Sequence, residues 1–186
     1  RFPPPKLRWF STVDFDDVPS GSAIAPGQYA GVTFSTVSPA GRPVYAATWP
    51  QSAKSTPNLV TLTPPNVLPA FDARDGAIKA QFSSLQMSVS IDALALVTPE
   101  TLGMKVTNQP FLEAFGDNDV FLGKVLYPIA EGAPGYGSWQ TLTISSPTAN
   151  IRYVLFSCQH ASGPAVYGMF DNLYFQVGIW DLRTRS

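Results

Sequence analysis

Several residue types that commonly carry catalysis are scarce in this sequence of 186 residues, which has one cysteine and one histidine. A single cysteine excludes an intramolecular disulfide framework. A single histidine excludes a zinc centre built on several histidines, and any Ser-His-Asp or Cys-His mechanism would have to use His160 as its base. There is no apolar run of about 18 residues, so no membrane-spanning helix is expected.

Charge is also sparse, at 13% of residues, and its distribution is uneven. Five of the twelve basic residues lie in residues 1–8 and 183–186, whereas all 13 acidic residues and seven basic ones lie in 11–182, a net charge of -6. A body of this charge repels phosphate backbones, and its basic residues form no stripe with aromatics. We therefore expect no nucleic-acid partner, and favour divalent cations and neutral ligands.

Glycine (14) and proline (18) are abundant, and apolar residues make up 45% of the chain in short alternating segments rather than in helical patterns. About eleven strands are expected, at 11–16, 29–36, 43–49, 58–63, 76–84, 86–96, 110–115, 120–126, 139–145, 150–158 and 166–178. Strands without covering helices must bury their apolar faces sheet against sheet. The sequence therefore predicts an all-β, two-sheet antiparallel sandwich or jelly roll of about eight to eleven strands.

The domain is expected to span residues 11–180, between a proline-stiffened linker, "RFPPPK", within 1–10 and a short tail at 181–186. The chain starts at Arg1 without a charged-then-apolar leader, so we expect it to be a mature or excised part of a larger protein.

Two aspartates interrupt the apolar rows of the first and last predicted strands. In "VDFDD", strict alternation puts Asp17 on the face of Val13 and Phe15, and in "FDNLYF" it puts Asp171 on the face of Leu173. An ionised carboxylate on a core face is costly unless it is paired or binds a metal. First and last strands are often neighbours in sandwiches, and oxygen-bearing side chains without His or Cys suit calcium better than zinc. The oxygen-bearing side chains of the two segments are Asp14, Asp16, Asp17, Asp171 and Asn172.

A second interpretation of the same residues stays open. In this interpretation, Asp17 lies beyond the end of the strand and caps the turn "DDVPSG", and Asp171 accepts backbone N–H groups in a bulge.

The order of several short motifs resembles that of bacterial secreted jelly-roll domains similar to calcium-containing carbohydrate-binding modules of galactose-binding-like type. The motifs are "VDFDDVPSG", "QYAGVTFST", "PPNVL", "FLEAFGDNDVFLGK", "GSWQTLTI", "NIRYVLFS" and "GMFDNLYF". The resemblance implies a structural calcium between the first and last strands, with Asp16, Asp17 and Asp171 as ligands and Asn66 as a looser candidate. It also implies a secreted or cell-surface location and a polysaccharide or glycan as partner.

Glycan-binding proteins commonly offer exposed aromatic rings beside amides. Two clusters fit that description, and their candidate ligand residues are Tyr45, Trp49, Tyr136 and Trp139. A place in the core is the competing interpretation, because aromatics favour strands and cores.

Catalysis is not favoured by the remaining residues. Cys158 continues an apolar row and is expected to be buried, although its reactivity stays open. Glu113 alternates outward from its strand, where a solvated face explains it, and no paired-carboxylate pattern of a glycosidase is present. Three functions remain: a non-catalytic carbohydrate-binding module with a structural calcium, a structural or adhesion domain of a larger surface protein, and a carbohydrate-active enzyme.

Overall fold

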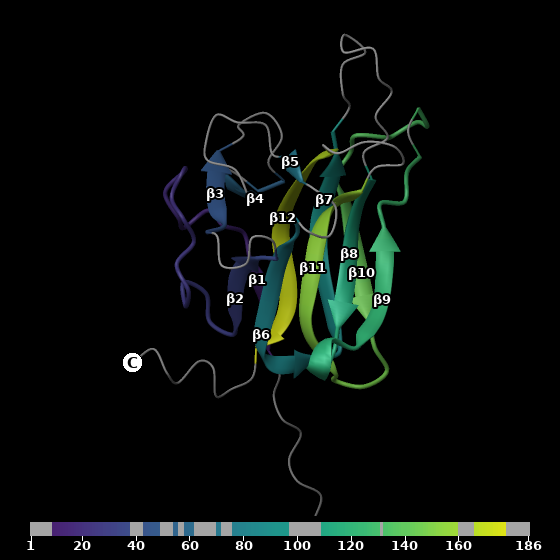
Figure 1. Cartoon of the computed structure of the whole chain (residues 1–186). Helices are drawn as coiled ribbons and strands as arrows, with labels where there is room; N and C mark the ends of the chain where they lie inside the picture. The colour runs from purple at the N-terminus through teal and green to yellow at the C-terminus, as the bar shows by residue number, and fades with distance from the viewer. Residues whose placement is uncertain are drawn as a thin grey trace, which may run out of the picture.

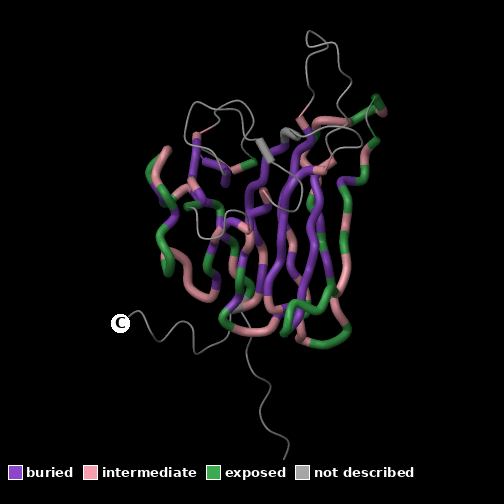
Figure 2. The backbone as a smooth tube through the Cα atoms, in the orientation of Figure 1, coloured by how far each residue is buried: buried purple, intermediate pink, exposed green. Residues whose placement is uncertain are grey.

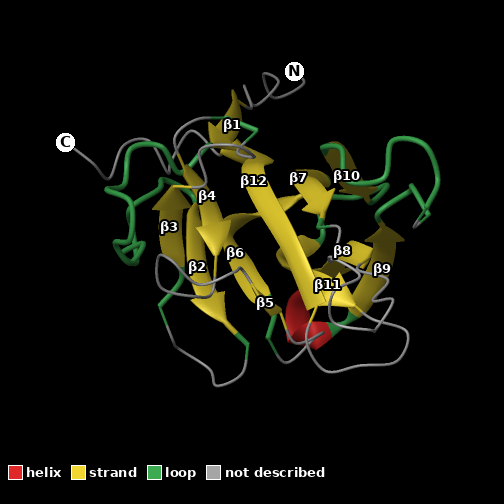
Figure 3. Ribbon diagram, turned by 90° about the horizontal axis from the view of Figure 1, so that it is seen from above, coloured by secondary structure: helices red, strands yellow, loops and turns green. Residues whose placement is uncertain are grey.

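The computed structural model describes residues 9–37, 43–48, 54–55, 58–61, 70–71, 76–96, 109–130, 132–159 and 166–177. These residues form two antiparallel sheets packed face to face, so the predicted β-sandwich is confirmed. Figure 3 shows the two layers seen from above.

The seven-stranded sheet has a central path of five strands, and two further strands pair with one of them. The path runs β10 (Gln140–Ser145), β7 (Ser88–Ala95), β12 (Val166–Val177), β4 (Asn58–Thr61) and β3 (Tyr45–Thr48). The strands β1 (Trp9–Val13) and β5 (Ala70–Phe71) each pair with β12.

The five-stranded sheet runs in the order β2 (Val32–Thr36), β6 (Ile78–Gln86), β11 (Ile151–Gln159), β8 (Gln109–Phe115) and β9 (Phe121–Leu126). These strands follow one another from left to right in Figure 1. A short 3-10 helix at Asp117–Asp119, with Asn118 at φ 57, joins β8 to β9. The strands β8 and β9 thus form an antiparallel hairpin.

All eleven predicted segments overlap observed strands. The missed strand, β5, has two residues, which is too short to show alternation. The first strand begins at Trp9, inside the segment expected to be a linker.

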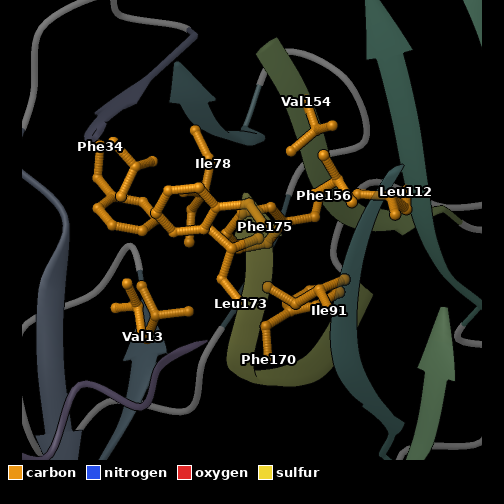
Figure 4. Packing of buried hydrophobic residues seen from close by; sticks show 14 of the residues in the cluster. Val13, Phe34, Ile78, Ile91, Leu112, Val154, Phe156, Phe170, Leu173 and Phe175 are labelled. Carbon is orange, nitrogen blue, oxygen red and sulfur yellow. The ribbon is translucent and has the colours of Figure 1, made fainter. Parts of the chain in front are cut away.

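Side chains from both sheets fill the space between the layers. The buried cluster combines Phe34, Ile78 and Phe156 of one sheet with Phe170 and Phe175 of the other, each at most 7% exposed. Figure 4 shows these side chains meeting between the layers, and Figure 2 shows that most strand positions are buried. Burial of apolar area from both faces is the main stabilising contribution in such a sandwich.

Both strands in which alternation predicted a core-facing aspartate are irregular at that point, so that prediction is wrong. The strand β1 ends at Val13, and Phe15 has a left-handed backbone with φ 63. In β12, Asn172 has φ 43 and is an extra residue against β7, where Asp171 pairs with Asp92 and Leu173 with Ile91. A bulge shifts the alternation by one residue, so Phe170 and Leu173 face the core and Asp171 faces away from it.

Candidate functional site

The first and last strands are neighbours, as expected. The strand β1 pairs with β12 in a register from Trp9 opposite Val177 to Val13 opposite Leu173. The end of β1 therefore lies beside the β12 bulge, and the segment 14–18 continues past it.

Asp171 is fully buried, and its carboxylate accepts three N–H or O–H groups. The Ser55 N–H donates to Oδ2 at 2.8 Å, the Ser55 hydroxyl lies 3.1 Å from the same oxygen, and the Asn172 N–H donates to Oδ1 at 2.8 Å. These bonds match the bulge interpretation that the sequence left open. They also tie the segment 54–55 to β12.

Asp16 is held by Asn58, the first residue of β4. The Asn58 N–H donates to Asp16 Oδ1 at 2.7 Å, and the Asn58 side-chain amide donates to the carbonyl oxygens of Phe15 and Val18 at 3.1 and 2.7 Å. Asn58 is 1% exposed and also accepts the Thr48 hydroxyl. One buried amide thus fixes the turn that carries the acidic residues.

Asp17 has different partners from Asp16 and Asp171. It is exposed, and its carboxylate accepts the Tyr29 hydroxyl at 2.6 Å and the Gln28 amide at 3.2 Å. Burial and the Asp17 carboxylate together raise the pKa of Tyr29 far above its ordinary value. Asp17 has therefore left the strand, as the second interpretation held, although its bonds anchor Tyr29 rather than cap the turn.

The charge of Asp171 is poorly compensated. Burial raises the pKa of its carboxyl, the Ser55 and Asn172 hydrogen bonds lower it, and the Asp16 carboxylate raises it, so that the pKa is about 6 instead of 3.8. A proton or a cation at this point would relieve the electrostatic cost. Asp16 and Asp171 are thus the pair of predicted ligands whose charges interact.

A buried carboxylate that the sequence analysis missed lies beside Asp171. Asp92 on β7 is 1% exposed, pairs directly across from Asp171, and accepts the Asn172 amide at 3.1 Å and the Tyr174 hydroxyl at 3.0 Å. The Thr141 hydroxyl donates to its other oxygen. Asp92 belongs to the outward-facing row of its strand, where an acidic residue is common. Only the register between β7 and β12 could have shown that it is buried beside Asp171.

No group of three or more His, Cys, Asp and Glu side chains that could hold a metal ion occurs among the residues that the structure describes. A cation near Asp16 and Asp171 would therefore need carbonyl or amide oxygens as further ligands, as calcium accepts. Among the described residues, Asp16 uses only Oδ1 for hydrogen bonding. The looser candidate, Asn66, lies outside the described residues.

The predicted ligand aromatics have distinct surroundings. Tyr136, in the connection from β9 to β10, is half-buried, and its ring packs edge-on against Tyr127 at 6.1 Å. Trp139 is half-buried and packs against an outer cluster of Leu59, Leu94 and Met169. Both side chains are therefore neither fully exposed, as the ligand-binding interpretation expects, nor fully buried, as the core interpretation expects.

The other two candidate aromatics belong to β3 and to the segment that follows it. Tyr45 is half-buried at the start of β3, opposite Thr61 of β4. Trp49 lies outside the described residues.

The two residues weighed for catalysis are both buried. Cys158 is 0% exposed, and burial raises the pKa of its thiol, which agrees with a packing role. Glu113 is only 3% exposed and forms an ion pair with Lys124 at 3.3 Å, so the predicted solvated position is wrong. It does face away from the core, but the outward side chains around it on β8 and β11, among them Phe111, Phe115 and Leu155, are themselves buried. His160 lies outside the described residues.

The described residues thus form a two-sheet antiparallel β-sandwich. No family model and no curated protein matches the chain. Among solved structures it is similar to the K2 cleaved adhesin domain of Lys-gingipain, at 15% identity and a TM-score of 0.51, with 91% of this chain and 98% of that chain covered.

Two further structures are similar. One is the K1 cleaved adhesin domain of Lys-gingipain from Porphyromonas gingivalis W83, at 14% identity and a TM-score of 0.48 over 91% of this chain and 99% of that chain. The other is the CBM22-1 xylan-binding domain of Paenibacillus barcinonensis Xyn10C, at 11% identity and a TM-score of 0.37 over 93% and 97%. At these identities the comparisons show the fold alone.

Within the described ranges, no helix has the length and apolar character needed to cross a bilayer.

Proposed function

We propose that this chain is a non-catalytic binding or adhesion module of a secreted or cell-surface protein, and that its ligand is a glycan. The similarity in fold to a domain named as an adhesin supports the binding role and the location. The pairing of Glu113 and the burial of Cys158 support a non-catalytic role, because neither group is poised for chemistry.

The observation that carries glycan recognition is the arrangement of the 127–140 connection. The Tyr127 hydroxyl donates to the Ser138 carbonyl, the Ser138 hydroxyl donates to the Gly135 carbonyl at 2.6 Å, and the Gln140 amide donates to Ser138 Oγ at 3.0 Å. These bonds lie in the same short connection as the half-buried ring of Tyr136, which packs edge-on against Tyr127. An aromatic ring with adjacent fixed polar groups suits a sugar, which has both apolar C–H faces and hydroxyls. We call residues 132–140 the sugar loop.

A pull-down on insoluble polysaccharides tests this proposal, with release of reducing sugar measured in parallel. The wild-type chain is expected to bind at least one polysaccharide without releasing sugar, and Tyr136→Ala is expected to weaken that binding. The variant Phe10→Ala, at a residue that is 79% exposed on β1, is a matched control expected to bind normally. Sugar release that depends on one carboxylate would support the enzyme instead, and absence of binding to any polysaccharide would leave the adhesion alternative.

We further propose that the Asp16 and Asp171 pair takes up a structural calcium ion. The raised pKa of Asp171 supports this, because a cation would compensate a buried charge that the protein hydrogen bonds leave costly. Calcium would then join β1 to β12 and stabilise the folded state by mass action.

Thermal unfolding with calcium or with chelator tests the metal proposal. Calcium is expected to raise the melting temperature of the wild type, and Asp171→Ala is expected to remove the response. Asp17→Asn is the matched control, since Asp17 is bonded to Tyr29, and it is expected to keep the response. Identical melting curves with and without calcium would contradict the site.

A further inference from the structure

The edge strand β9 and the residue before it carry a concentration of exposed apolar side chains. Val120, Phe121 and Leu126 are 55%, 52% and 39% exposed, and they are three of the five large hydrophobic side chains that are exposed in the described part of the chain. Scattered single residues of this kind are normal on a protein surface, whereas a group on one strand indicates an interaction site.

The ring of Phe121 is held in place by a row of side chains that crosses the five-stranded sheet. Phe121 lies opposite Phe115 of β8, Phe115 opposite Tyr153 of β11, and Tyr153 opposite Gln81 of β6. The Phe115 and Tyr153 rings stack at 4.9 Å, and the Phe121 ring packs edge-on against Phe115 at 5.6 Å. Phe121 therefore presents a half-exposed ring on a rigid support.

The polar groups farther along β9 from Phe121 are also fixed. Lys124 Nζ lies 3.3 Å from Glu113 Oε1, donates to Gln159 Oε1 at 2.7 Å, and sits 4.0 Å from the centre of the Phe111 ring. The Gln159 amide in turn donates to Gln109 at 3.0 Å. Because the ammonium and the carboxylate neutralise each other, this pair adds hydrogen-bonding groups without adding net charge.

We propose that Phe121, Lys124, Leu126 and Gln159 form a second sugar-contact surface, the β9 face, along which an extended neutral polysaccharide runs toward the sugar loop. The inference rests on the proposed glycan-binding function and extends it. Tyr127 follows Leu126 directly, is buried, and packs edge-on against Tyr136, so the end of β9 leads straight into the sugar loop. Figure 1 shows the connection rising beyond the end of β9.

The dimensions suit a chain of several sugars rather than one. The five residue steps from Phe121 to Leu126 span roughly 17 Å. Neutral polysaccharide is favoured over an acidic one because residues 11–182 carry a net charge of -6, which repels polyanions. A protein strand added to the edge of β9 is disfavoured by the β-bulge in the β8 and β9 pairing and by Lys124 in the middle of the strand.

A length series of oligosaccharides tests the β9 face. The probes are a disaccharide, a tetrasaccharide and a hexasaccharide of xylan, glucan and mannan type, titrated calorimetrically into the whole chain. Wild-type affinity is expected to rise with length, and Phe121→Ala is expected to lower hexasaccharide affinity on the order of tenfold while leaving disaccharide affinity unchanged. The variant Met87→Ala, at a residue that is 37% exposed in the turn between β6 and β7, should match the wild type throughout.

The other possible results would overturn either the β9 face or the proposed glycan function. Hexasaccharide binding that is as strong in Phe121→Ala as in Met87→Ala, or wild-type affinity that does not rise with length, overturns the β9 face but leaves the sugar loop. A change in self-association of Phe121→Ala, measured by light scattering, with sugar binding unchanged would make β9 a protein interface and also overturn the inference. No binding of any oligosaccharide or polysaccharide by the wild type contradicts the proposed glycan function itself.

Discussion

At the residue scale, Asn58 and Asp171 do most to position the acidic segment. Asn58 connects the turn after β1 to β4 through donors that no apolar residue can replace. Asp171 connects the segment 54–55 to β12. Both residues are buried, so the loss of either leaves backbone groups without partners in a low-dielectric environment.

Replacement of Asn58 by alanine is expected to lower the free energy of unfolding by roughly 2 to 4 kcal/mol, because the Phe15 and Val18 carbonyls lose their buried donor. Urea unfolding measures the change. Asn58→Asp, which keeps the shape but cannot donate from its carboxylate, should be destabilised as well. Thr12→Ala, at an exposed position on β1, is the control and should have little effect. Equal stability of Asn58→Ala and Thr12→Ala would contradict the role given to the amide.

The pKa of Asp171 predicts how stability depends on pH. Its carboxyl has a pKa of about 6 when folded against 3.8 ordinarily, so the folded state binds more protons between these values. The contribution of this group to the free energy of unfolding is therefore fully present below the ordinary pKa. It is lost as the pH rises through about 6, by roughly 3 kcal/mol in all.

The comparison of wild type with Asp171→Asn isolates this effect from other carboxyls. With chelator present, the unfolding free energy of the wild type should fall relative to that of Asp171→Asn as the pH rises from about 4 to about 7. Bound calcium should reduce the shift, since a cation favours the ionised carboxylate. A constant difference across this range would show that Asp171 titrates normally.

At the element scale, β12 has more strand partners than any other described strand, and it contains a bulge. It pairs with β1, β4, β5 and β7 along its length, and the extra residue Asn172 lets its core row change register between Phe170 and Leu173. A glycine also lies near its start. A methyl group added at Gly168 would overlap Cys158 Sγ and lie 3.4 Å from the Leu94 carbonyl oxygen.

Gly168→Ala is therefore expected to cost about 1 to 3 kcal/mol through overpacking between β12 and β11. Removal of the sulfur in Gly168→Ala with Cys158→Ala should recover part of this loss, so a double-mutant cycle should give a favourable coupling. Gly123→Ala, where the nearest atom is the flexible end of Ile144 at 3.3 Å, is the matched control. Simple additivity of the two changes would rule out the predicted clash.

Strand positions were predictable because alternation of apolar and polar residues reports burial directly, as in β2, β6 and β10. The predicted face of Asp171 was wrong because a bulge shifts alternation without leaving a composition signal. The burial of Glu113 was missed for a related reason. Alternation indicates which side of a sheet a residue faces, but it does not indicate whether that side is covered.

At the scale of the whole molecule, the two sheets present different chemistry on their outer faces. The outer face of the seven-stranded sheet carries the buried carboxylates Asp92 and Asp171, which the proposed cation would compensate. The outer face of the five-stranded sheet carries paired charges and the ring of Phe121. The proposed cation site therefore lies on the seven-stranded sheet, whereas the proposed sugar contact extends from the five-stranded sheet into the sugar loop.

Chemical-shift mapping by NMR during a titration with oligosaccharide tests this assignment most directly, because it locates the contact without altering the protein. We expect perturbed amides in β9, in adjacent β8 and β11, and in the sugar loop, with little change near Asp92. Perturbations confined to the seven-stranded sheet, or none with any neutral oligosaccharide, would contradict it.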